Sequence, residues 1–151
     1  MKNLALSIVF LLSLNLLSAQ TISFNPRTGD VEMDGFLKDV NTKATENIND
    51  FIDNVSTKFN TAKDKVKELL KVMAPGDVYM TAQTAEIVKK PLDDVAVAYN
   101  KNKDKGWGQI AKELGIKPGS PEFHALKKSM KGNGNGNGKG NGNGKGKGKN
   151  K

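Results

Sequence analysis

The sequence contains no cysteine, one tryptophan and one histidine among its 151 residues. The absence of cysteine excludes disulfide bonds, a catalytic thiolate, a thiolate-bound zinc ion and an iron–sulfur cluster. The single histidine, His124, has few candidate ligands near it, since Glu122 two residues earlier falls on a different helical face. We therefore expect a domain that is stable without disulfides and that holds no metal and no other cofactor.

Long apolar stretches are also scarce, and the clearest one lies at the N-terminus. Residues 4–17 form a mostly apolar run after Lys2, and the small residues Ser18 and Ala19 follow it. This order is typical of a secretory signal peptide. The run is shorter than the roughly 20 apolar residues that a membrane-spanning helix needs. We predict that residues 1–19 are a cleavable signal, that the mature chain is secreted or periplasmic, and that no transmembrane segment remains.

The other end of the chain has no apolar residue at all. Residues 131–151 contain only glycine, asparagine and lysine. Nothing in this stretch can be buried to offset the entropy of ordering it, so we predict a disordered, low-complexity tail. Its six lysines are Lys131, Lys139, Lys145, Lys147, Lys149 and Lys151. Spaced lysines favour contact with a polyanion, such as an anionic cell-surface polymer or nucleic acid. A spacer without a partner is the alternative.

The net charge of +8 comes mostly from this tail. When Lys2 and the six tail lysines are set aside, residues 20–130 hold 17 basic and 16 acidic residues. A domain so close to neutral lacks the excess of positive charge that nucleic-acid-binding faces usually carry. The charge therefore argues against nucleic-acid binding by the domain itself.

The first segment after the signal, residues 20–35, has the pattern of a β-hairpin. Ile22 and Phe24 alternate with polar residues, as do Val31 and Met33. The sequence NPRTGD between the two pairs is rich in turn-forming residues. We predict a short hairpin with one apolar face.

Residues 36–76 have apolar side chains at spacings of three and four, which predicts a long amphipathic helix. The apolar positions begin with Phe36, Leu37, Val40, Ala44, Ile48, Phe51, Ile52, Val55 and Phe59. Weaker helix formers at residues 56–61 mark a point where the helix could break. The Ala-Pro-Gly sequence at 74–76 should end it. A coiled-coil seam is the alternative, but its heptad register is not strict.

Residues 77–130 predict a compact module of three or four short helices. Asp77 is a good N-cap, and Pro91 suits the first turn of another helix. Gly115 fits the end of a helix that starts at Trp107, and Ser120 should cap the last helix. The whole pattern predicts a mainly α fold: a short hairpin, one long helix, this helical module and a disordered tail.

Three patches within this module, DVYMTAQTAEIVKKPLDDV, GWGQIAKELGI and KPGSPEFHALK, are similar to a recurring module of small exported bacterial proteins. That family has no established activity. The resemblance covers about fifty residues; it implies export and a helical fold, and it transfers no catalytic role.

The same region also resembles a DNA-binding helix-turn-helix. Ala111 and Gly115 stand four apart, as a small residue that lets the second helix approach and a glycine at the turn. The pattern departs from that family at Pro121, where an apolar residue is expected. A plain helical hairpin uses the same packing and needs no DNA.

Trp107, the only tryptophan, is the candidate ligand-binding residue of the module. Its ring could stack on a sugar or a base, or it could anchor the helical hairpin by burial; the small number of aromatic residues favours the anchor. No catalytic constellation is evident. We expect an exported, non-catalytic binding protein with a cationic tail. The alternatives are a secreted hydrolase and a helix-turn-helix-like nucleic-acid binder.

Overall fold

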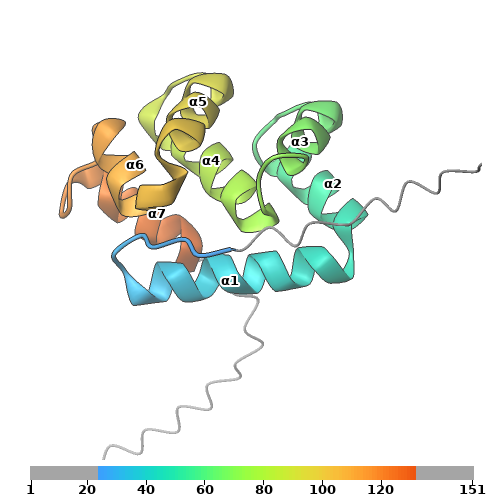
Figure 1. Cartoon of the computed structure of the whole chain (residues 1–151), viewed down its shortest axis with the longest axis horizontal. Coiled ribbons are helices and arrows are strands. Elements are labelled where there is room, and N and C mark those ends of the chain that lie inside the picture. The colour runs from blue at the N-terminus through green and yellow to red at the C-terminus, as the bar shows by residue number, and fades with distance from the viewer. Residues whose placement is uncertain (1–23, 132–151) are drawn as a thin grey trace, which may run out of the picture.

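The computed structural model describes residues 24–131, and the regular structure of this part is entirely helical (Figure 1). The helices are α1 (Val31–Glu46), α2 (Ile48–Lys58), α3 (Lys63–Leu70), α4 (Pro75–Val88), α5 (Leu92–Asn102), a 3-10 turn η1 (Lys103–Lys105), α6 (Trp107–Glu113) and α7 (Pro121–Lys131). The predicted mainly α class is confirmed. The predicted signal peptide and all of the predicted tail except Lys131 lie outside the described residues.

The predicted β-hairpin at residues 20–35 is wrong in its described part. Residues 24–30 form no strand and include left-handed backbone angles at Arg27 and Gly29, and Val31 and Met33 lie in the first turn of α1. Asp30 is the reason, because its carboxylate accepts the backbone N–H groups of Glu32 and Met33 and so caps the helix. An acidic first turn adds a favourable interaction with the helix dipole. These local signals outweigh two alternating apolar residues.

The predicted long helix over residues 36–76 is also wrong, because the chain breaks it into three. Asn47 ends α1 and caps the start of α2, because its side-chain oxygen accepts a hydrogen bond from the backbone N–H of Asp50. A second break follows α2, where Asn60 adopts a left-handed φ of 47°. The apolar spacing continues across both breaks because each short helix turns its own apolar face to one core, through Leu37, Phe51 and Val66 for example.

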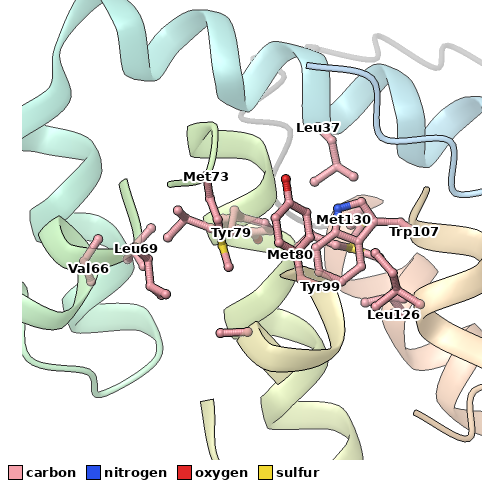
Figure 2. Close-up of a cluster of buried hydrophobic side chains, with 14 of the residues drawn as sticks. Leu37, Val66, Leu69, Met73, Tyr79, Met80, Tyr99, Trp107, Leu126 and Met130 are labelled. Atoms are coloured by element: carbon pink, nitrogen blue, oxygen red, sulfur yellow. The ribbon is translucent and has the colours of Figure 1, made fainter. Parts of the chain in front are cut away.

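Helix α4 is the centre of the fold. Every residue from Gly76 to Ala85 is buried, and α1, α2, α3, α5 and α7 all contact this helix. Figure 2 shows the core side chains that gather around it, with Leu37 approaching from α1 and Tyr99 and Leu126 from the other side. The buried positions of α4 include the polar residues Asp77, Thr81, Gln83 and Thr84 as well as apolar ones. In the described part of the chain, no helix is long and apolar enough to cross a membrane.

Asp77 does not cap α4 as predicted. The helix starts two residues earlier, at Pro75, with Ala74 in the cap position, so Asp77 lies in the first turn with its side chain buried in the core. Pro75 suits this start because the first helical residue needs no backbone N–H.

Helix α1 lies along one side of the other helices, with α2 and α3 at one end and α6 and α7 at the other (Figure 1). The hairpin of α6 and α7 has the expected ends. Gly115 takes a φ of 95° just after α6, and the Ser120 hydroxyl accepts the backbone N–H of Phe123 at 3.2 Å.

Candidate functional site

Trp107, the predicted ligand-binding residue, lies in the core at the start of α6. Its side chain is 1% exposed, and its indole N–H donates to the Asp77 carboxylate at 2.7 Å. The Tyr99 hydroxyl donates to the other oxygen of the same carboxylate at 2.8 Å. The centroids of the Tyr99 and Trp107 rings are 5.4 Å apart. These contacts join α4, α5 and α6 and fit the anchor interpretation. Direct ligand contact by Trp107 stays a prediction.

The environment of Asp77 is unusual for a carboxyl group. Burial raises the pKa of Asp77, and the hydrogen bonds from Trp107 and Tyr99 only partly oppose that shift. Burial together with the nearby Asp77 charge raises the pKa of Tyr99, so Tyr99 stays a hydrogen-bond donor. Asp77 also lines a cavity of about 370 Å³ with Lys103 and Asp104, which we call the Asp77 pocket. Each carboxylate oxygen already accepts a bond from a core side chain, so the arrangement supports a structural role.

Asp77 should lower the free energy of unfolding as the pH rises, whereas an acid whose pKa is lowered on folding raises it. Its pKa is raised on folding above the ordinary 3.8, so its contribution is present at low pH and is lost as the pH rises through the raised pKa. We expect the stability of wild type relative to Asp77→Asn to fall over that window. Urea unfolding followed by circular dichroism from about pH 3 to pH 7 measures this difference.

Asp30 and Glu32 act in the opposite direction, because the nearby lysines of α7 lower their pKa values. Their contribution is the same in both proteins, so it cancels when the stability of Asp77→Asn is subtracted from that of wild type. A difference between wild type and Asp77→Asn that stays constant with pH would contradict the raised pKa.

Residues 24–30, the N-terminal strap, hold the start of α6. The backbone N–H of Trp107 donates to the Pro26 carbonyl at 2.8 Å, and that of Gly108 donates to the Arg27 carbonyl at 2.9 Å. The strap thus satisfies two N–H groups that the first turn of a helix leaves free. A Cβ at Gly108 would lie 3.0 Å from the Thr28 carbonyl oxygen, so glycine permits this close approach.

A second cavity, of about 380 Å³, lies between the strap and the α6–α7 hairpin; we call it the module pocket. Its apolar lining is Met33, Met80, Trp107, Ala111, Ile116, Pro118, Phe123 and Leu126. Its charged lining is Arg27, Lys105 and Lys112. Trp107 and Phe123, which the sequence places on either side of one turn, both face this cavity.

The largest of the three cavities, about 630 Å³, lies between α1 and α2. We call it the α1–α2 groove. Its apolar floor consists of Phe36, Val40, Ala44, Phe51, Val55 and Tyr79, and its rim of Asp39, Lys43, Asn47, Asp50, Asn54, Thr57 and Lys58. No sequence pattern indicates this groove, because it exists only where the chain turns at Asn47.

The aromatic end of the groove is firmly packed. The rings of Phe36 and Phe59 each meet the Tyr79 ring edge-on, with centroids 5.4 Å apart. The Lys58 ammonium lies 4.7 Å from the centre of the Tyr79 ring and also donates to its hydroxyl. Cations are attracted to the faces of aromatic rings, so Lys58 holds one wall of the groove in place.

Of the six predicted polyanion contacts, the described part of the chain includes only Lys131. Its ammonium pairs with Glu32 of α1 at 2.8 Å, and Lys127 one turn earlier pairs with Asp30 at 2.6 Å. The helix that would read bases in a helix-turn-helix therefore directs two of its lysines at the cap and first turn of α1.

Among residues 24–131, no group of three or more His, Asp or Glu side chains is placed to hold a metal ion. Comparison of this chain with models of known protein families, with curated proteins and with solved structures gives no match.

Proposed function

We propose that the protein is an exported, non-catalytic binding protein whose helical domain takes an apolar segment of a partner protein into the α1–α2 groove. The observation that carries this proposal is the groove itself, an apolar floor bordered by polar side chains and larger than the other two cavities. Concave sites of this size with mostly apolar walls and a few polar groups are the usual form of binding sites. Export rests on the signal pattern of residues 1–19 and on the resemblance to small exported proteins.

A partner helix with one apolar face fits this shape, because such helices bind grooves through side chains one turn apart. Burial of the apolar contacts would supply the affinity. The rim carries charges of both signs: Asp39 and Asp50 are acidic, and Lys43 and Lys58 are basic. Rim charges contribute more to orientation and partner choice than to affinity.

The two alternatives from the sequence have less support. A hydrolase needs convergent acid and base groups, whereas the buried Asp77 carboxylate is held by two core donors. A nucleic-acid-binding helix α7 needs free lysines, whereas two of its three lysines, Lys127 and Lys131, pair with Asp30 and Glu32 at the start of α1.

The groove should bind a neutral apolar probe, N-phenyl-1-naphthylamine, whose fluorescence rises on burial. We expect Val40→Lys, which puts a charge on the floor, to weaken binding of the probe by about tenfold or more. Burial of a valine side chain contributes roughly 1.5–3 kcal/mol of free energy. Val97→Lys on α5 is the matched control, since Val97 is 67% exposed and lines none of the three cavities. Circular dichroism verifies that both variants are folded.

A soluble amphipathic helical peptide should then displace the probe from wild type. The groove is not the site if Val40→Lys and Val97→Lys bind the probe equally well. A protein segment is not its occupant if the peptide leaves the probe in place.

The tail lysines should hold the protein at anionic surfaces in a salt-dependent way. Removal of residues 132–151 takes away five of the six lysines. We expect full-length protein to bind immobilised heparin and to lose affinity by roughly 100- to 500-fold over a fourfold rise in salt, as five lysine contacts imply. The truncated protein should bind weakly at every salt concentration.

A variant with the same five lysines changed to glutamine keeps the length of the tail and is the control. Equal binding by the full-length and truncated proteins, or binding that does not change with salt, would leave the tail as a spacer.

A further inference from the structure

We infer that the module pocket is a second binding site, which takes a small amphiphile with one apolar chain and one carboxylate. It is separate from the α1–α2 groove. The C-terminal half of α1 and α2 line the groove, whereas the strap, α6 and α7 line the module pocket. Helix α2 and the α6–α7 hairpin lie at opposite ends of α1 (Figure 1). The proposal does not depend on what the groove binds.

The walls of the module pocket suit an aliphatic chain. Met33, Met80, Ile116 and Leu126 line the cavity and are each at most 2% exposed, so a bound chain must displace their side chains slightly. Methionine side chains adapt their shape to a bound apolar group at little cost. The volume of about 380 Å³ is near the lower end of small-molecule sites, which span roughly 300–1,000 Å³. The ligand must therefore be small.

The charges around this cavity are of one sign. Arg27, Lys105 and Lys112 line it, and within residues 24–131 no carboxylate side chain does. None of the three forms an ion pair in that part of the chain, although lysines elsewhere on the domain do. This local excess stands out in a domain with nearly equal numbers of acids and bases.

Two of these three cations, Arg27 and Lys105, are held near the cavity by bonds to neutral groups. The Arg27 guanidinium donates to the Asp104 backbone carbonyl, and the Lys105 ammonium donates to the Asn102 side-chain oxygen at 3.2 Å. Such bonds leave the positive charges without a counter-charge. A carboxylate suits this arrangement because guanidinium and ammonium groups form strong charge-assisted bonds with it. The apolar walls and the cationic lining together specify an anionic amphiphile.

The backbone frame around the pocket is in place without a ligand. The strap closes one side through its bonds to the start of α6, and the absence of a side chain at Gly108 allows that contact. Much of the remaining wall comes from the patches GWGQIAKELGI and KPGSPEFHALK, which supply Gly108, Gln109, Ala111, Lys112, Ile116, Pro118 and Phe123. A backbone frame that is already in place limits the entropy lost on binding.

Trp107 makes the proposal directly testable, because it is the only tryptophan and lines the pocket. Titration with sodium octanoate, below its micelle concentration, should produce a saturable change in tryptophan fluorescence. We expect octanol to bind about tenfold or more weakly, since it lacks the charge-assisted contacts. Acetate, which lacks the chain, and octyltrimethylammonium, which carries the wrong charge, should produce no saturable change.

Lys112→Gln should weaken octanoate binding about three- to tenfold and leave octanol binding unchanged, as expected for one exposed charged contact. Lys101→Gln is the matched control, an exposed lysine of α5 that lines none of the three cavities. Val40→Lys in the groove should bind octanoate like wild type.

The proposal is overturned if octanoate gives no saturable signal, if octanol binds as tightly as octanoate, or if Lys112→Gln and Lys101→Gln behave alike. Loss of octanoate binding in Val40→Lys alone would place the ligand in the α1–α2 groove and likewise overturn it.

Discussion

Replacement of Trp107 by alanine should lower the free energy of unfolding by about 3–5 kcal/mol, the usual range for an aromatic side chain removed from a core. The indole is 1% exposed and contacts Tyr99, so its loss leaves a cavity where α4, α5 and α6 meet. Domains of this size have total stabilities of about 5–15 kcal/mol, so the variant should lose a large fraction of its stability. Urea unfolding followed by circular dichroism measures the change without relying on tryptophan fluorescence.

Trp107→Phe separates the two contributions of the indole. Phenylalanine keeps most of the ring but has no N–H, so one oxygen of the buried Asp77 carboxylate loses its donor. We expect a cost of about 1–3 kcal/mol from the unsatisfied acceptor. If Trp107→Ala unfolds at the same urea concentration as wild type, the anchor role is wrong and ring stacking on a ligand becomes the better explanation for this residue.

Two glycine-to-alanine changes in helices should shift stability in opposite directions. A Cβ at Gly76, in the first turn of α4, would lie 2.9 Å from the Leu37 carbonyl oxygen and would also meet the Phe24 ring. The Leu37 oxygen belongs to the backbone of α1 and has little freedom to move. We expect Gly76→Ala to cost about 1–3 kcal/mol, as overpacking of a core does.

Gly35 in α1 is the matched control, because a Cβ there meets nothing within 4 Å. Gly35→Ala should stabilise the protein by about 0.5–1 kcal/mol, since alanine loses less backbone entropy in a helix. The same urea experiment measures both. Gly76→Ala combined with Phe24→Ala should recover only part of the loss, because the Leu37 contact remains. Equal stability of Gly76→Ala and Gly35→Ala would show that α1 and α4 are not in such close contact.

Local signals in the sequence predict the ends of helices correctly, whereas the longer apolar pattern does not predict where the chain turns. The ends of α6 and α7 follow from Gly115 and Ser120, which act on neighbouring backbone groups. The prediction of one long helix is wrong because apolar spacing indicates which residues face the core and does not indicate where the helix axis turns. The cap at Asn47 was present in the sequence, but the continuous apolar stripe concealed it.

The candidate sites were harder to find for the same reason. Trp107 was singled out because it is unique, yet its partner Asp77 lies 30 residues earlier and looked like a helix cap. The α1–α2 groove requires the angle between two helices, and the module pocket requires the strap to fold back on α6. No local pattern encodes either arrangement.

The strap has a consequence for the order in which the protein folds. Its two backbone bonds join residues roughly 80 positions apart, since Pro26 and Arg27 contact Trp107 and Gly108. In a chain made from its N-terminus, the strap emerges early, but it has no helix to cap until α6 has been synthesised. Contacts between such distant segments form late, because closing a long loop must precede any gain from them. Closure of the module pocket should therefore be among the last steps of folding, after α1–α5 have assembled around the central helix.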